Sequence, residues 1–129
     1  MHAVDTNIVV RYVTGDDPRQ SPRAKALIDG GPIFVPTTVI LETEWVLRTL
    51  YRLSAAEITA AIRTLAGQPT VTLEQPMLVR TALEWSESGV DLADALHLAS
   101  SHHCESFASF DRSLAKAAKR VTDLPITEP

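Results

Sequence analysis

The hydrophobic positions of this chain form short apolar runs that alternate with longer amphipathic segments. This alternation is typical of β–α–β units that build a parallel sheet. Four runs lead directly into a helical pattern, and a fifth lies close to the C-terminus. We therefore predict a parallel sheet of four to five short strands, at His2–Asp5, Ile33–Pro36, Val71–Leu73, Ser106–Phe110 and Pro125–Thr127.

Seven segments have helical periodicity or helix-start signals. The clearest start is Ser54, because Glu57 follows three positions later and the two residues form a capping-box pattern. Thr37 or Thr38 is the expected N-cap of the longest helix. The predicted helices span Thr6–Thr14, Pro22–Asp29, Thr37–Arg52, Ser54–Gly67, Pro76–Ser88, Asp91–His103 and Asp111–Val121. The fold class is therefore α/β, with helices on both faces of the sheet.

Length and composition indicate one globular domain over residues 1–129, since 129 residues suffice for one core and are too few for two. No apolar run approaches the roughly 18 residues of a membrane span. The single cysteine, Cys104, excludes an internal disulfide and a cysteine-rich zinc site. These features together predict a cytoplasmic protein that does not enter a membrane.

Acidic residues lie at the ends of two predicted strands, where ligands collect in parallel α/β folds. Asp5 ends the first strand and Asp111 ends the fourth. Taken alone, each is explained equally well as the N-cap of the helix that follows. Asp91 is also a natural N-cap, and Asp94 falls in the same first turn, where the helix dipole favours negative charge.

Glu42 is harder to explain by local structure. In its helix, Val39 and Leu50 belong to one predicted apolar stripe, and Glu42 borders that stripe. The same spacing directs Glu44 and Arg48 away from it. A carboxylate beside the core needs a partner, because burial of an unpaired charge costs several kcal/mol. A metal ion would be such a partner.

Four of these acids differ from the rest because each lies at or beyond the end of an apolar run, so that they are able to converge. They are Asp5, Glu42, Asp94 and Asp111. Hard divalent cations such as Mg²⁺ or Mn²⁺ bind clustered carboxylates. The chain has 12 basic and 16 acidic residues, a net charge of −4 that argues against nucleic-acid binding. Setting the four acids aside leaves 12 acidic residues, so the remainder is neutral and the argument loses its force.

Four stretches of the chain, in order, resemble the PIN-domain ribonucleases and, more narrowly, the VapC-type toxins of toxin–antitoxin pairs. The stretches are AVDTNIVVRY, TTVILETEWVL, DLADALHLAS and SFDRSLAK. The resemblance implies a three-layer α/β/α fold. It also implies that Asp5, Glu42, Asp94 and Asp111 are the metal-binding and catalytic acids. Thr6 and Asn7 match the residues after the first aspartate, and Asp91 is an additional nearby acid.

The implied activity is hydrolysis of RNA phosphodiester bonds by an enzyme that uses Mg²⁺, with Mn²⁺ as the alternative ion. Arg11, Arg112 and Lys116 lie near the proposed site elements and would contact the RNA, although a solvated surface explains them equally well. The resemblance further implies a homodimer and a cognate VapB-type antitoxin. An apolar patch that includes Leu41 and Trp45 would serve such a contact, or else pack under the next helix.

Other readings of the strand-end acids remain. A haloacid-dehalogenase-type phosphatase needs a second aspartate where this chain has Asn7, and a receiver domain needs a late lysine where it has LPITEP. Both are disfavoured. A non-catalytic PIN-like binding module, which would use the pocket only for docking, is the main rival. A DNA-cleaving nuclease is a lesser alternative, because the acids do not distinguish RNA from DNA.

Overall fold

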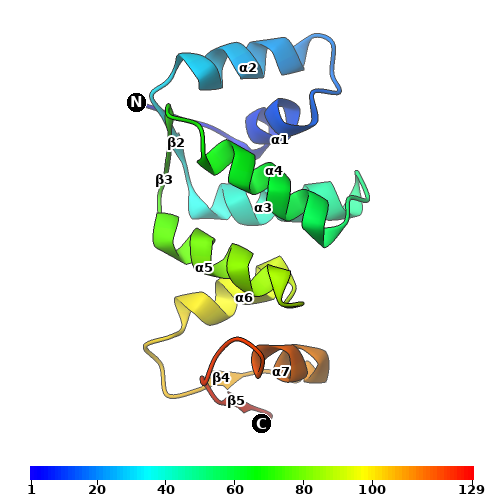
Figure 1. Ribbon diagram of the computed structural model, residues 1–129, viewed down its shortest axis with the longest axis vertical. Helices are drawn as coiled ribbons and strands as arrows, with labels where there is room; N and C mark the ends of the chain where they lie inside the picture. Colours follow the sequence, from blue (N-terminus) through cyan, green and yellow to red (C-terminus); the bar gives the residue numbers. More distant parts are fainter. The chain divides into compact units, whose positions relative to one another are not determined.

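The computed structural model describes all 129 residues, which form two compact units, Met1–Pro76 and Met77–Pro129 (Figure 1). The first unit contains β1 (His2–Ala3), α1 (Thr6–Thr14), α2 (Gln20–Gly30), β2 (Ile33–Val35), α3 (Thr37–Thr49), α4 (Ala55–Ala66) and β3 (Val71–Leu73). The second contains α5 (Pro76–Glu87), which begins at the boundary, then α6 (Leu92–Ser100), β4 (Phe107–Ala108), α7 (Arg112–Ala118) and β5 (Ile126–Thr127). The prediction of a single domain stays a prediction.

All five predicted strands are present, and every pairing between them is parallel. In the first unit the order is β1-β2-β3, with Ile33 opposite His2 on one side and Val71 on the other. Ile33 is fully buried at the centre of this sheet, as its apolar character requires. In the second unit β4 pairs with β5, with Phe107 opposite Ile126. The α/β class with short parallel strands is therefore confirmed.

Several helix starts follow the local sequence signals. Ser54 and Glu57 form the predicted capping box at the start of α4, with both reciprocal hydrogen bonds present. Asp5, Asp91 and Asp111 are the N-caps of α1, α6 and α7. These starts are predictable because the capping side chain lies within a few residues of the backbone groups that it satisfies.

Two other helix starts differ from the prediction. Neither Thr37 nor Thr38 caps α3; its N-cap is Pro36, and the Glu74 carboxylate accepts the hydrogen bond of the Thr37 N–H at 2.9 Å. A distant side chain therefore replaces the expected local cap. Helix α2 begins before Pro22, because Asp17 Oδ1 accepts hydrogen bonds from the N–H groups of the two residues at its start, at 2.9 and 2.7 Å.

The predicted buried stripe of α3 is confirmed only at Val39, which is 8% exposed. The other buried side chains of the helix are Ile40, Thr43, Glu44 and Leu47, whereas Leu50 is 69% exposed. Glu44, expected to point away from the core, is only 3% exposed, and Arg48 Nε donates to its Oε1 at 2.7 Å. Glu44 and Arg48, one turn apart, therefore form an ion pair on a side of α3 that periodicity predicted to face solvent.

Glu42 consequently lies on an exposed side of α3 rather than at the edge of the core. The helix nevertheless directs it toward α1, which contacts α2, α3 and α4 in the first unit. Helix α1 buries Val9 and Val10 and ends at Gly15, whose backbone has φ 61°. This left-handed conformation suits glycine, and the Gly15 N–H donates to the Arg11 carbonyl oxygen at 3.1 Å. Asp5 and Arg11 are thus held at the two ends of a short, well-packed helix.

None of the helices combines the length and the apolar character that crossing a membrane requires.

Candidate functional site

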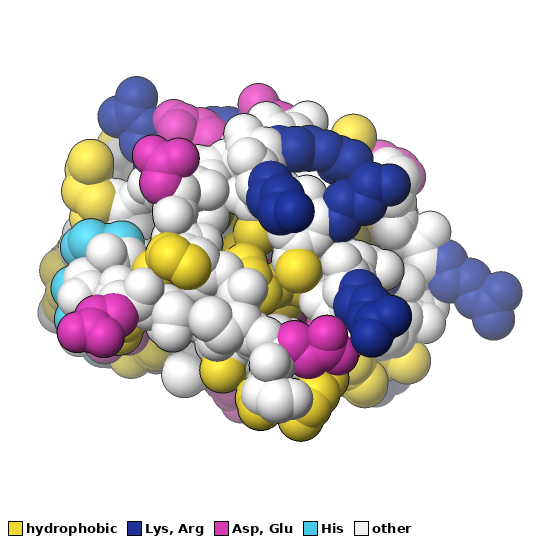
Figure 2. Space-filling model, turned by 90° about the horizontal axis from the view of Figure 1, so that it is seen from below, with side chains coloured by type: hydrophobic (Ala, Val, Ile, Leu, Met, Phe, Trp, Pro, Cys, Tyr) yellow, Lys and Arg dark blue, Asp and Glu magenta, His cyan; other side chains and the backbone are white.

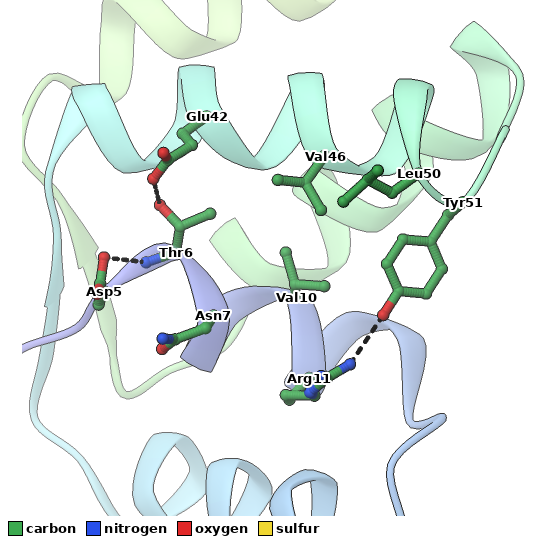
Figure 3. A pocket seen from close by; sticks show the side chains of 9 residues that line it. All are labelled: Asp5, Thr6, Asn7, Val10, Arg11, Glu42, Val46, Leu50 and Tyr51. Atoms are coloured by element: carbon green, nitrogen blue, oxygen red, sulfur yellow. Dashed lines mark hydrogen bonds between the residues drawn. The ribbon is translucent and has the colours of Figure 1, made fainter.

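The first unit contains a pocket of about 390 Å³ that holds five of the predicted site residues (Figure 3). These five come from the β1–α1 junction, from α1 and from α3. The pocket is lined by Asp5, Thr6, Asn7, Val10, Arg11, Glu42, Val46, Leu50 and Tyr51. Carboxylates therefore stand at one end of the pocket, and an arginine with a tyrosine stands at the other.

Asp5 has two roles in this pocket. It follows β1 with an extended backbone, φ −85° and ψ 164°, and its side chain caps the start of α1. Its Oδ1 accepts the Thr6 N–H at 2.7 Å, which satisfies a backbone donor that has no partner within the helix. The other carboxylate oxygen accepts no hydrogen bond in the structure and remains available to a ligand.

Thr6 joins Asp5 to Glu42. Its backbone N–H binds Asp5, and its side-chain hydroxyl donates to Oε1 of Glu42 on α3 (Figure 3). Thr6 is buried, whereas both carboxylates are exposed to the pocket. The partner that Glu42 was expected to need is thus a threonine hydroxyl, which orients the carboxylate and leaves its second oxygen without a hydrogen bond.

The donor set at this end of the pocket consists of oxygen atoms, apart from the Asn7 amide nitrogen. Two carboxylate oxygens, those that Thr6 does not occupy, and the Asn7 carbonyl oxygen are the hard ligands that Mg²⁺ and Mn²⁺ prefer. The residues therefore fit a divalent cation in chemical type. Within each unit, however, no three His, Cys, Asp or Glu side chains gather closely enough to hold a metal ion by themselves.

Arg11 is held in place at the far end of the pocket. Its Nη1 donates to the Tyr51 hydroxyl at 2.9 Å and approaches Asp16 Oδ1 at 3.4 Å, and its Nε donates to Gln20 at 2.8 Å. Hydrogen bonds from Thr14 and then from Tyr51 hold the pKa of the Asp16 carboxyl below its ordinary value. Arg11 is therefore a positioned cation whose charge is partly offset by an ionised neighbour.

The predicted acids of the second unit lie at the starts of two helices. Asp91 Oδ1 accepts the Ala93 N–H at 3.0 Å, and Asp111 Oδ1 accepts the Leu114 N–H at 3.0 Å. Asp94 is in the first turn of α6 and is half-buried. The local explanation of Asp91 and Asp111 as N-caps is confirmed. Convergence of the four acids on one metal stays a prediction.

The predicted RNA-contacting residues of the second unit are exposed. Arg112 lies 3.6 Å from Glu128 in a solvent-facing ion pair, and Lys116 lies one turn further along α7. Lys and Arg side chains protrude from the surface in the view of Figure 2. Both residues are thus accessible to a ligand, and an exposed ion pair is weak enough to be exchanged for a phosphate.

Tyr51, Asp16 and Gln20 were not predicted as site residues. They contribute the hydroxyl, carboxylate and amide that surround Arg11. Asp16 contacts Tyr51, which lies 35 residues later in the chain, beyond β2 and α3. Local spacing carries no information about that contact.

The PIN domain family model matches residues 3–120, and the chain therefore belongs to the PIN domain family. The matched region includes every predicted site residue of both units. The mixture of seven helices and short parallel strands is compatible with the three-layer α/β/α fold that the family implies. PIN domains are generally metal-dependent nucleases. Among curated proteins, no match to this chain was found.

Proposed function

We propose that the protein is a Mg²⁺-dependent endoribonuclease that acts as the toxin of a toxin–antitoxin pair. The observation that carries the proposal is the link through Thr6 between Asp5 and Glu42, in a pocket of a PIN domain. This link places two carboxylates on one pocket wall and leaves an oxygen of each available. Such a wall suits a divalent cation and a phosphate that approaches it.

In this proposal Asp5 and Asp94 hold the metal directly, and Glu42 and Asp111 complete the acidic set. Bound Mg²⁺, or Mn²⁺ in its place, would supply Lewis-acid activation of water and offset the phosphate charge. Glu42, oriented by the Thr6 hydroxyl, is suited to accept a proton from the attacking water. Water adds to phosphorus as the bond to the 3′ oxygen breaks, and that oxygen takes a proton from solvent, which leaves a 5′-phosphate and a 3′-hydroxyl.

The cations of the chain would hold the RNA. Arg11 is fixed at the pocket, and Arg112 and Lys116 are exposed on α7. For partners we propose a VapB-type antitoxin and a homodimer within the larger complex. Trp45 and Leu50 support a protein partner for α3, because Trp45 is 52% exposed on the helix and Leu50, its C-cap, is 69% exposed.

The test is cleavage of end-labelled total bacterial RNA by purified protein free of antitoxin. Parallel samples contain Mg²⁺, Mn²⁺, EDTA, or the Asp94→Asn variant with metal. Asp123→Asn is the matched control, because Asp123 is an exposed aspartate that makes no side-chain hydrogen bond or ion pair. We expect discrete fragments with wild type and the control, and their loss with EDTA and with Asp94→Asn.

Three other outcomes contradict parts of the proposal. Cutting that survives EDTA and Asp94→Asn would point to contamination or to a different site. Folded protein that cuts no RNA under any metal would favour the non-catalytic docking module. Metal-dependent cutting of a DNA pool, with RNA left intact, would show that the protein is a deoxyribonuclease and not a ribonuclease.

A further inference from the structure

A second pocket, of about 380 Å³, adjoins the acidic pocket in the first unit. It lies between α1 and α2 and is lined by Asn7, Ile8, Arg11, Gln20, Arg23, Ala24 and Leu27. Asn7 and Arg11 line both pockets, since they lie one turn apart on the same side of α1. Figure 3 shows this arrangement: Thr6 and Val10 extend toward α3, while Asn7 and Arg11 lie on the other side of the helix.

The two pockets differ in charge. Asp5 and Glu42 line the first pocket, whereas no acidic residue lines the second. Arg23 projects from α2 as an exposed cation that pairs with no carboxylate, and Arg11 adds a second guanidinium at the shared wall. A polyanion that places one phosphate against the acids and their metal would therefore find an acid-free, arginine-lined pocket beside it.

The polar groups of the second pocket also include amide donors without partners. Gln20 Oε1 accepts from Arg11 Nε at 2.8 Å, which fixes the amide and leaves its NH₂ group free. The Asn7 side chain makes no hydrogen bond in the structure. Beside these amides, Ile8 is half-buried and Leu27 is 39% exposed, so apolar surface is open to a ligand. Amides and apolar surface together suit the edge and the face of a nucleobase.

We propose that this second pocket, between α1 and α2, is a nucleotide subsite for the RNA residue next to the phosphodiester that is cut. Arg23 binds the phosphate of that nucleotide, the Asn7 and Gln20 amides contact its base edge, and Ile8 and Leu27 contact its base face. The inference rests on the proposed ribonuclease function. It adds a substrate-binding residue, Arg23, outside the acidic pocket.

Binding is tested by NMR titration of the full chain with each ribonucleoside 5′-monophosphate, with the nucleoside and with inorganic phosphate, all in EDTA. We expect a nucleotide to shift the side-chain amide signals of Asn7 and Gln20 and the Arg23 Nε–H signal. Arg23→Gln should weaken that binding at least about fivefold. Arg19→Gln is the control, because Arg19, at the N-cap of α2, is also exposed and unpaired but lines neither pocket; it should change binding less than about twofold.

Cleavage kinetics supply the second readout. Arg23→Gln should raise KM at least about fivefold and leave kcat within about twofold, because it removes binding away from the reacting atoms. Equal losses in Arg23→Gln and Arg19→Gln, or shifts with phosphate that leave both amides unmoved, would overturn the subsite. RNA cleavage without any nucleotide-induced shift would contradict the subsite and leave the ribonuclease proposal standing. Arg23-dependent nucleotide binding by a protein that cuts no RNA would support the subsite and contradict the ribonuclease proposal.

Discussion

The acids of the two units perform different structural work, although in the sequence they look alike. In the first unit Asp5 caps a helix and also shares Thr6 with Glu42, a residue from another helix. In the second unit Asp91 and Asp111 each bind a backbone N–H two or three residues ahead. One pair of acids is joined by tertiary structure, and the other two residues are explained by their own helix starts.

This difference shows why a capping aspartate should not be excluded from a site. An N-cap uses one carboxylate oxygen, and Asp5 keeps the second free in a pocket. Capping and ligand binding are therefore compatible in one side chain. Asp5 differs from Asp91 in its link, through Thr6, to a carboxylate on another helix, Glu42 on α3.

The largest expected effect separates these two roles of Asp5. Asparagine caps helices about as well as aspartate but lacks the negative charge. Asp5→Asn should leave the urea unfolding midpoint nearly unchanged and reduce metal-dependent cleavage at least about 100-fold. Asp17→Asn makes the same exchange at the start of α2, outside the acidic pocket, and should retain activity. If Asp5→Asn cleaved as well as wild type, Asp5 would be only a cap.

A smaller effect is expected from breaking the link between the two acids. Thr6→Val keeps the shape of the side chain and the backbone N–H that binds Asp5, but it removes the hydroxyl that orients Glu42. We expect about a tenfold loss in kcat, because Glu42 remains present and is only misplaced. Thr6→Ser, which retains the hydroxyl, should recover most of this loss. Equal rates in the valine and serine variants would show that Thr6 does not position Glu42.

The sequence predicted the parts of this site that depend on neighbouring residues. The five strands, the Ser54 capping box and the helix-start positions of Asp5 and Asp111 all follow from short patterns, and all are present. The periodicity of α3 predicts Glu42 at the border of the core, whereas the structure exposes it. Its place in the pocket comes instead from the packing of α1 against α3.

The remaining features depend on contacts that local periodicity does not encode. Helix α3 has apolar residues on two sides, and which side is buried depends on the elements that pack against the helix. The alternative stripe also contains Glu44, whose partner Arg48 lies four residues later and makes its burial tolerable. The start of α3 is similar, because its cap comes from Glu74 beyond β3. Both errors arise where tertiary contacts replace local ones.

The smallest expected effect concerns carboxylates of the first unit that cap helices away from the acidic pocket. A hydrogen bond from the Gln20 backbone N–H is the main reason that the pKa of the Asp17 carboxyl lies below its ordinary value of 3.8. A hydrogen bond from the Ser54 backbone N–H likewise holds the pKa of the Glu57 carboxyl below its ordinary value of 4.5. The folded state therefore binds these protons more weakly than the unfolded state. The stability that the two ionised carboxylates contribute is fully present above their ordinary pKa values. It is lost as the pH falls through their lowered pKa values in the folded state.

Acid should consequently loosen the starts of α2 and α4 by protonating their caps, while at pH 6 both caps are intact. The measurement is the urea unfolding midpoint at pH 6 and at pH 3 for wild type and for Glu57→Gln. Glutamine also serves in a capping box but does not titrate, so the variant should lose less stability between the two pH values than wild type does. An identical loss in both proteins would mean that the Glu57 cap does not contribute to acid sensitivity.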